Sequence, residues 1–314
     1  MSASKTTYDV LIIGAGPAGL STALGLARQT YSALVFDSQQ YRNAPASHMH
    51  NVVTWDHRDP AEFRASAREN ILARYSDSIQ FKNAIIDKVK KCDDGTFEVA
   101  DTDKVTYHGK KLVLASGIKD IMPEEIKGFK ELWGKLIFHC LFCHGFEERG
   151  AKRAGVLASG FLTAPPMVLH MARMATNLAE HVTIYCHGNA ELEATLKKTL
   201  EGKGVTVEGR KLTTVESLGE GLKIHFEDGA STEERFLVNV PNCKLNGSFH
   251  EQLGLQVDPM VFIKVNPPFN ETDVGGVFVA GDCGTMLKAA PQAIAMGTFT
   301  SGGLVAQLAA MGKF

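Results

Sequence analysis

The first forty residues alternate between apolar runs and small residues in an order that predicts a strand, a helix and a second strand. Residues 8–13 end in the continuous apolar run Val10-Leu11-Ile12-Ile13, which is typical of a buried parallel strand. Small residues recur through residues 17–29, which we expect to form a helix, and Leu34-Val35-Phe36 follows as the next strand. This βαβ opening predicts the first half of a nucleotide-binding sheet.

The rest of the chain continues to alternate between strand-like and helix-like patterns. In the first half these patterns predict a helix over 60–74, which starts at a proline, and strands over 79–89, 96–100 and 111–117. In the second half they predict strands over 154–158, 182–185, 205–226, 236–240 and 276–282, with helices over 165–179 and 289–312.

Two breaks in this pattern predict the domain organisation. Pro123 and the charged residues after it mark a crossing into a second unit, and residues 241–247 have the composition of a linker back. We therefore predict an α/β protein with two Rossmann-like, nucleotide-binding-type domains. The first comprises residues 1–119 and 244–314, and the second is an inserted domain of residues 120–243.

Composition narrows the functional classes. A chain of 314 residues can form two domains with full cores, and its formal net charge of −2 favours neither nucleic acid nor an anionic membrane as a partner. The N-terminus lacks the apolar core of a signal peptide, and we expect no membrane-spanning segment. A cytoplasmic location is expected.

A glycine-rich turn follows the first strand and carries a dinucleotide fingerprint. Gly14, Gly16 and Gly19 permit a tight turn, a close approach of the backbone to a pyrophosphate, and packing of helix on strand. The helix N-terminus would then face the phosphates. Asp37 ends the second strand, where its carboxylate can accept hydrogen bonds from ribose hydroxyls.

A second motif, Cys140-Leu141-Phe142-Cys143-His144, suggests thiol–disulfide chemistry. We expect the pair to lie at a helix start, where the dipole lowers the pKa of the first thiol. His139 and His144 flank the pair and are candidate acids or bases.

Other interpretations of this motif stay open, namely half of a zinc site, a c-type haem attachment and an inert pair. The remaining cysteines, at 92, 186, 243 and 283, lack metal-like spacing, so no metal site is expected.

The order of these motifs along the chain resembles the low-molecular-weight thioredoxin reductases. Within that superfamily it most resembles the fungal thioredoxin-reductase-like dithiol oxidases, which close the disulfide of natural products such as gliotoxin. The matching stretches are Gly14 to Gly19, Tyr41-Arg42-Asn43, His48-Met49-His50-Asn51, Trp55-Asp56-His57-Arg58, Cys140 to Cys143, Glu147-Glu148-Arg149-Gly150 and Gly281-Asp282-Cys283.

The resemblance implies FAD as the cofactor and a homodimer as the assembly. It implies that Asp282 contacts the ribityl–phosphate side of the flavin, that Ser116-Gly117 is a connector, and that the His48–Asn51 segment meets the flavin. The expected FAD-binding residues are Gly14, Gly16, Pro17, Ala18, Gly19, Asp37, Ser38, Arg42, His50, Asn51, Ser116, Gly117, Gly281 and Asp282.

The chain departs from the reductases where they bind NADPH. The strand ending at Gly160 runs into Phe161 and then Pro165-Pro166, and no arginine pair follows Cys186. A phosphate cradle and a charge partner for NADPH are therefore missing from the sequence. Position 144 also differs, because the reductases usually have aspartate there.

The resemblance implies a mechanism in which a small-molecule dithiol supplies the electrons. A substrate thiolate attacks Cys140, the second substrate thiol releases a cyclic disulfide, and Cys143 passes two electrons to FAD, which O₂ reoxidises to give H₂O₂. His144, with His139 as a second candidate, would deprotonate the thiols. The alternatives are an NADPH-dependent disulfide reductase and a non-catalytic flavin redox sensor.

Overall fold

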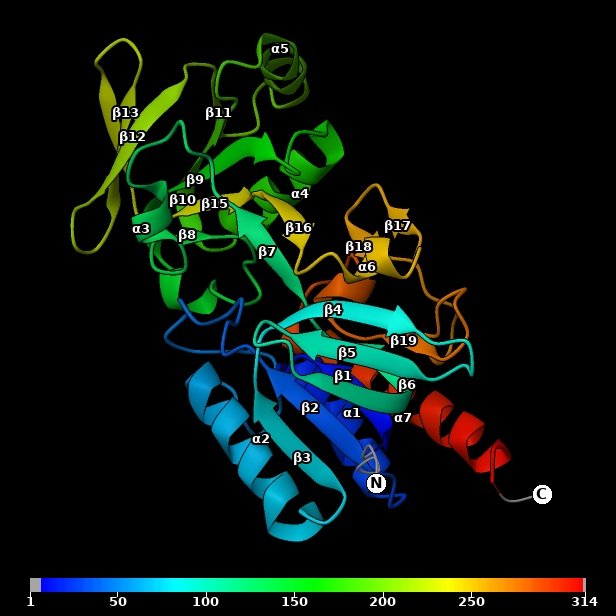
Figure 1. The fold of residues 1–314 in the computed structure, drawn as a ribbon. Helices are drawn as coiled ribbons and strands as arrows, with labels where there is room; N and C mark the ends of the chain where they lie inside the picture. The colour runs from blue at the N-terminus through cyan, green and yellow to red at the C-terminus, as the bar shows by residue number, and fades with distance from the viewer. Residues whose placement is uncertain (1–6, 313–314) are drawn as a thin grey trace.

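The computed structural model describes residues 7–312, and its two lobes are seen in Figure 1. The lower lobe is built from the N-terminal and C-terminal parts of the chain, and the upper lobe comes from the middle. Each lobe has its own sheet and its own buried core. The chain therefore has the predicted α/β architecture with one unit inserted into another.

The lower lobe contains a seven-stranded sheet in the order β3-β2-β1-β6-β5-β4, with β19 also paired to β6. Its strands are β1 (Thr7–Ile13), β2 (Ala33–Asp37), β3 (Ile79–Asn83), β4 (Ile86–Lys91), β5 (Phe97–Asp101), β6 (Thr106–Leu114) and β19 (Val277–Val279). The strands β3, β2, β1, β6 and β19 are parallel, whereas β4 and β5 form antiparallel pairs.

The long strand β6 organises this sheet. Its first half pairs with β5 and its second half with β19, while β1 runs along its other edge. The central strands are apolar on both faces because cores cover both sides of the sheet, and Val10, Leu11 and Ile12 are fully buried. This burial confirms the predicted βαβ opening.

Helices and short elements complete the lower lobe. These are α1 (Pro17–Ala27), α2 (Pro60–Tyr75), α6 (Phe249–Gln252), the short strands β17 (Val257–Asp258) and β18 (Phe262–Ile263), the 3₁₀ turn η2 (Asp282–Gly284) and α7 (Ala290–Ala310). The helices α1 and α7 pack closely, since a Cβ at Gly297 would lie 2.3 Å from the carbonyl oxygen of Ala18.

Helix α7 corrects the expectation that no segment is long enough to span a membrane. Its 21 residues are long and apolar enough by length and composition, with a mean hydropathy of 1.3 over the relevant window. Nearly half of that window is buried inside the protein, and Leu304 and Leu308 belong to the core between the sheet and α1. In this structure α7 is thus a packing helix of the lower lobe.

The upper lobe is built on a parallel five-stranded sheet in the order β11-β10-β9-β15-β8. Its strands are β8 (Ile137–Phe138), β9 (Ala151–Gly160), β10 (Ala179–Tyr185), β11 (Val205–Glu208) and β15 (Leu237–Val240). The helices are α3 (Phe129–Leu132), α4 (Pro165–Thr176) and α5 (Ala190–Thr199), with the 3₁₀ turn η1 (Phe146–Glu148).

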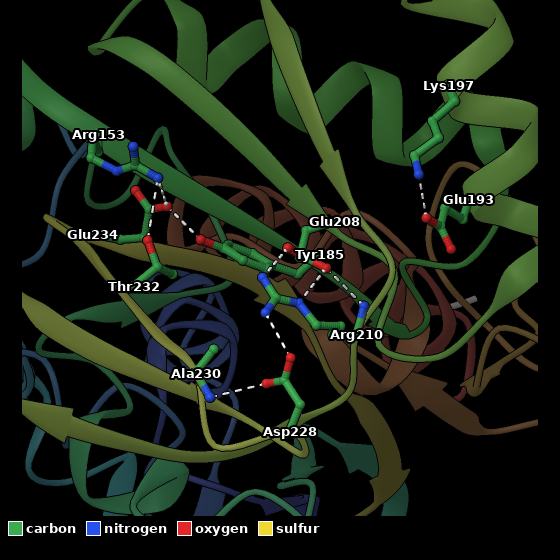
Figure 2. A network of polar contacts seen from close by, with 10 residues as sticks. All are labelled: Arg153, Tyr185, Glu193, Lys197, Glu208, Arg210, Asp228, Ala230, Thr232 and Glu234. Atoms are coloured by element: carbon green, nitrogen blue, oxygen red, sulfur yellow. Dashed lines mark hydrogen bonds and ion pairs between the residues drawn. The ribbon is translucent and has the colours of Figure 1, made fainter.

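A separate antiparallel sheet of β12 (Leu212–Ser217), β13 (Leu222–Phe226) and β14 (Ser231–Glu234) projects from this lobe. A buried polar cluster joins it to the main sheet (Figure 2). The hydroxyl of Tyr185 donates to the carboxylate of Glu234, and Arg153 lies 3.3 Å from the same oxygen. Burial raises the pKa of Glu234, so these donors offset the cost of placing its carboxylate in the core.

Two strands connect the lobes. β7 (Ile118–Ile121) leads out of the lower lobe and β16 (Asn242–Leu245) leads back, and they form an antiparallel pair. Cys243 lies opposite Asp120 in this ribbon. The predicted domain boundaries, at 119/120 and 243/244, both fall inside the ribbon.

Several predicted elements differ in detail from the observed ones. The run 79–89 is two strands. The first, β3, pairs with β2 and ends at Asn83, and the second, β4, pairs with β5. The run 205–226 contains three strands from two sheets, and 241–247 includes β16 in place of a simple linker. Helix α5 was not predicted; it begins at Asn189, whose side chain accepts a hydrogen bond from the Leu192 amide.

The buried Tyr185–Glu234 contact predicts a measurable contribution to stability. The second carboxylate oxygen of Glu234 already has no hydrogen-bond partner among the described residues, so Tyr185→Phe would leave the whole group poorly satisfied. We expect a loss of about 1–3 kcal/mol in the free energy of unfolding, measured by denaturant titration.

Tyr8→Phe is the matched control, because the Tyr8 hydroxyl donates to Gln80 at the exposed surface. This change should stay within about 0.5 kcal/mol. Equal losses for the two variants would contradict the role assigned to the buried contact.

Candidate active site

The glycine-rich turn between β1 and α1 forms one end of the site. Gly14 has φ = +115°, and a Cβ there would lie 2.2 Å from the Ala115 carbonyl oxygen, so only glycine fits. A Cβ at Gly19 would lie 1.9 Å from the Gly14 carbonyl oxygen. The turn is thus held tightly between β6 and α1.

The start of α1 suits an anion. Gly16 precedes the helix, nothing lies within 4 Å of its Cβ position, and no side chain caps the helix. The free N–H groups of the first turn therefore face open space with a favourable dipole. This cradle fits the pyrophosphate of a dinucleotide.

Asp37 lies at the end of β2 and is 6% exposed. Its Oδ1 accepts a hydrogen bond from the Gln39 amide, and both carboxylate oxygens lie within hydrogen-bonding distance of the Tyr41 hydroxyl. Burial and the Asp37 charge raise the pKa of Tyr41 to about 12, so Tyr41 remains a donor. Because each carboxylate oxygen has two lone pairs, Asp37 retains capacity for a ribose hydroxyl.

Arg42 lies between the two lobes. It forms a bidentate ion pair with Asp120 of β7, with both distances 2.9 Å, and its Nη1 lies 3.0 Å from Asp282. Burial alone would lower the pKa of Arg42, but these carboxylates raise it above its ordinary value. Arg42 thereby fixes the loop after β2, the inter-lobe ribbon and the Gly281-Asp282 turn relative to one another.

These elements enclose a cavity of about 410 Å³ between the lobes. Every predicted FAD-binding residue except Gly19 lines it. The lining set is Gly14, Gly16, Pro17, Ala18, Asp37, Ser38, Arg42, His50, Asn51, Ser116, Gly117, Gly281 and Asp282. Gly19 lies beneath the turn, where it packs helix on strand. The open cradle and the acceptor at Asp37 fit FAD.

Lys288 and Asn246 are lining residues that the sequence analysis missed. Asn246 donates from Nδ2 to the Ser116 carbonyl oxygen, which holds the predicted connector in place. Burial lowers the pKa of Lys288. Neither residue belongs to a dinucleotide-binding motif, so their position beside the turns identifies them.

The thiol pair comes from the inserted lobe and borders this cavity. Cys143 is among the lining residues and Cys140 is not. Their Sγ atoms are 2.7 Å apart, with Cys143 as the donor, and both cysteines are free thiols. Cys143 therefore faces the predicted cofactor position, and Cys140 lies on the other side.

The cysteine pair does not lie at a helix start, so that prediction is wrong, but the pKa of Cys140 is lowered as predicted. Residues 140–144 form a single turn, in which the amides of Cys143 and His144 donate to the Cys140 carbonyl oxygen. The hydrogen bond from Cys143, aided by backbone amides, lowers the pKa of Cys140 to about 7 against the cost of burial. The same hydrogen bond, together with burial, raises the pKa of Cys143 above its ordinary value.

The two candidate histidines occupy different environments. His139 is enclosed against Trp133, with ring centroids 5.7 Å apart, and burial lowers its pKa to about 3. His144 stacks on Phe138 at 4.8 Å, and burial lowers its pKa as well. Both rings line the cavity and are neutral near pH 7. A pKa near 3 makes His139 the weaker proton acceptor.

The loop after Arg42 covers the thiol pair. Met49 forms a β-bridge with Arg58, which folds residues 49–58 into a closed loop. The side-chain amide of Asn51 donates to the Phe142 carbonyl oxygen at 2.7 Å. His50 lies 3.4 Å from Glu147, a residue whose contact with this loop the sequence does not reveal. The loop of the lower lobe is thereby attached to the cysteine turn of the upper lobe.

The turn between β9 and α4 occupies the position of a second dinucleotide site. A Cβ at Gly160 would lie 2.6 Å from the Val240 carbonyl oxygen, so this glycine serves backbone packing. Helix α4 begins with Pro165 and Pro166, which removes two amide donors from its first turn. Glu124 and Glu125 line the adjacent cavity of about 330 Å³. Anionic phosphates would meet few donors and two carboxylates here.

Arg210, near the ends of β10 and β11, is already paired (Figure 2). Arg210 donates to Glu208 at 3.0 and 2.6 Å and to Asp228 at 3.0 Å. Two carboxylates thus compete with any phosphate for this guanidinium.

Comparison with known proteins identifies relatives over the full length. A family model described as pyridine nucleotide-disulphide oxidoreductase matches residues 8–297. The chain is 41% identical over 305 residues to thioredoxin reductase aclD of Aspergillus oryzae, covering 96% of both chains. It is 39% identical over 312 residues to thioredoxin reductase sirT of Leptosphaeria maculans, covering 97% of this chain and 95% of the relative.

Solved structures agree with these matches. An oxidoreductase from Agrobacterium tumefaciens is similar with a TM-score of 0.87 at 30% identity, over 96% of this chain and 99% of that one. A structure titled HlmI gives a TM-score of 0.86 at 25% identity, over 98% and 95%. These matches confirm the predicted fold class and the resemblance to fungal thioredoxin-reductase-like proteins.

The coupling of the two thiols predicts a pH-dependent reactivity. In the reduced enzyme, alkylation of Cys140 by iodoacetamide should rise with pH through about 7, because the thiolate is the nucleophile. Cys143→Ala removes the main donor to that thiolate, so the midpoint should move up toward the ordinary value of 9.0. Rates are followed anaerobically by mass spectrometry of the labelled peptide.

Cys92→Ser serves as the control, since Cys92 lies at the β4–β5 turn, away from the pair. Its alkylation profile at Cys140 should match that of the unmodified protein. An unchanged midpoint in Cys143→Ala would disprove the proposed coupling.

Proposed function

The chain belongs to the pyridine nucleotide-disulphide oxidoreductase family and binds FAD, and we propose that it is an FAD-dependent dithiol oxidase. In this proposal a small-molecule dithiol supplies electrons through Cys140 and Cys143, and O₂ accepts them to give H₂O₂. The product is an intramolecular disulfide in the substrate.

The main support for this proposal is that the inserted domain lacks groups suited to binding the phosphates of NADPH. Its β9–α4 turn has lost two amide donors to Pro165 and Pro166, and Arg210 is paired with two carboxylates. A reductase needs these groups to hold the phosphates of NADPH. Without that electron donor, the thiol pair is the remaining entry point for electrons.

The residues that hold FAD would be the Gly14–Gly19 turn at the pyrophosphate, Asp37 at a ribose, and Asp282 on the ribityl–phosphate side of the flavin. When bound there, FAD supplies a two-electron acceptor that O₂ can reoxidise. The protein's own contribution is to place the sulfur of Cys143 toward that acceptor and to leave Cys140 for the substrate.

The exchange chemistry begins from the oxidised pair. A substrate thiolate attacks Sγ of Cys140, which breaks the Cys140–Cys143 bond, forms a mixed disulfide and leaves Cys143 as a thiolate. The second substrate thiol, once deprotonated, attacks the substrate sulfur of the mixed disulfide. The cyclic disulfide leaves, and both cysteines are then reduced.

The depressed pKa of Cys140 favours the second of these steps. Cys140 is the leaving group when the substrate ring closes, and a thiol of lower pKa leaves faster. Because its pKa is raised, the Cys143 thiolate released in the first step takes up a proton, and its hydrogen bond then stabilises the departing Cys140 thiolate. The coupling of the two sulfurs therefore promotes product release.

His144 is the group we assign to proton transfer. It follows Cys143 directly, lines the cavity and is neutral near pH 7, so it can accept the proton of an incoming thiol. His139 also lines the cavity, but its pKa of about 3 makes it a poor proton acceptor, which suits it to packing against Trp133.

The surface around the pair suits an apolar substrate. Phe142, between the two cysteines, is 72% exposed, and Phe146 is 69% exposed. Aromatic side chains at such exposure offer a contact surface for a small natural-product dithiol. The homodimer implied by the family resemblance stays a prediction.

Anaerobic mixing tests the direction of electron flow. A small dithiol such as dithiothreitol should bleach the flavin of the purified holoenzyme, and NADPH should not. Cys143→Ser should lose flavin reduction by dithiol, because the sulfur that faces the cofactor is gone, whereas Cys92→Ser should retain it. The measurement is stopped-flow absorbance, with H₂O₂ detected after air is admitted.

The competing functions predict different results in the same assay. In a disulfide reductase, NADPH would bleach the flavin. A redox sensor would bind FAD but would not consume oxygen when any dithiol is added. Flavin reduction that survives in Cys143→Ser would refute the assigned electron path.

Replacement of His144 tests the proton acceptor. His144→Gln should lower kcat/KM for a dithiol by roughly 10²–10⁴-fold, the range typical of a lost general base. Added imidazole should restore part of the rate. In His139→Gln the loss should be smaller and insensitive to imidazole, since a ring with a pKa of about 3 is not the proton acceptor. Imidazole rescue of His139→Gln alone would reverse the assignment.

A further inference from the structure

Three side chains converge beside the thiol pair and take no part in the exchange chemistry. Nε2 of His50 lies 3.4 Å from Oε1 of Glu147, and Nδ1 of His57 lies 3.6 Å from the same oxygen. One ligand atom from each residue lies within 4.8 Å of the others. His50 and His57 belong to the loop of the lower lobe, and Glu147 belongs to η1 of the upper lobe.

His50 is the most constrained member of this cluster. Its side chain is 10% exposed, and its Nδ1 lies 3.4 Å from Oδ1 of Asp56. The same carboxylate oxygen accepts a hydrogen bond from the Asn51 amide, which fixes its position. With the proton on Nδ1, beside Asp56, the Nε2 lone pair would be free on the side of Glu147.

That nitrogen is unsatisfied. Nε2 of His50 is buried and has no hydrogen-bond partner among the described residues. A buried lone pair that faces a carboxylate oxygen is unfavourable unless a cation lies between the two groups. His57 faces the same oxygen from the exposed side, so a cation placed there would meet three donors at once.

We propose that His50, His57 and Glu147 form a Zn²⁺ site. Two histidines and one carboxylate are a ligand set that zinc prefers, and Zn–N and Zn–O distances of about 2.0–2.2 Å place tetrahedral donors about 3.3–3.6 Å apart. The observed separations from Glu147 match this spacing. The Asp56–His50 contact supplies the outer-shell carboxylate that commonly orients a zinc-bound histidine.

The ion would have two structural consequences. It would join the loop of the FAD-binding lobe to the turn that carries the cysteines, alongside the Asn51–Phe142 hydrogen bond. Three protein ligands also leave the fourth tetrahedral position open to water or to a thiolate. His50 and Cys143 line the same cavity, so the open coordination position would lie near the thiol pair.

This proposal departs from the sequence-based expectation of no metal site. Glu147 is distant from the two histidines in sequence, and only the packing of the lobes brings it to them. The proposal does not depend on the oxidase reaction, because its readout is the binding of the ion.

Isothermal titration of the holoenzyme with Zn²⁺ tests the site. The cysteines are themselves zinc ligands, so the titration uses the full-length Cys140→Ser, Cys143→Ser double variant. We expect about one Zn²⁺ per chain, a stoichiometry checked by metal analysis after dialysis. His57→Gln and Glu147→Gln in this background should each weaken binding by at least tenfold, because loss of even an outer-shell partner costs about 10–100-fold.

The control variants are His181→Gln and Glu180→Gln. These residues are a neighbouring glutamate and histidine at the exposed start of β10, and the affinity should change by less than about twofold. Absence of stoichiometric binding in the Cys140→Ser, Cys143→Ser background would overturn the proposal. Binding that persists in both His57→Gln and Glu147→Gln would overturn it equally. Far-UV circular dichroism and flavin content establish that each variant is folded.

Discussion

The buried guanidinium of Arg42 is the interaction on which the arrangement of the site depends. It joins the loop after β2 to Asp120 of the inter-lobe ribbon and to Asp282 at the end of β19. Its charge also contributes to lowering the pKa of Cys140 and of His139. A single cation therefore holds three segments in place and adds to the other causes that lower the pKa of Cys140 and of His139.

The parts of this site that local sequence determines were predictable. The Gly14–Gly19 turn follows from its spacing between an apolar strand and a helix. The structure explains Gly14 and Gly19 by close backbone approaches, whereas Gly16 borders the open cradle. The contacts that join distant segments were not predictable. Asp120 as the partner of Arg42, and Glu147 as the partner of His50, lie in segments that no local pattern relates to the loop.

The low pKa of Cys140 was predicted correctly, but its physical cause is not the predicted helix dipole. Helical geometry was expected there, yet the chain makes one turn and stops. Gly145 closes that turn, because a Cβ there would lie 2.0 Å from the Leu141 carbonyl oxygen. The acidity of Cys140 comes mainly from its sulfur neighbour.

The inserted domain keeps its fold although its phosphate-binding groups differ from those of the reductases. Its parallel sheet has a full core, because core packing and ligand binding use different residues.

The pairing of β7 with β16 has a consequence for the history of the chain. Neighbouring strands lie about 4.8 Å apart, so the polypeptide leaves the flavin lobe and re-enters it at almost the same point. A unit attached through two adjacent ends can be exchanged, or lose its original ligand, while the host lobe keeps its chain path. With this geometry, the sequence and the ligand of the inserted lobe can change during evolution while the fold of the flavin lobe is preserved.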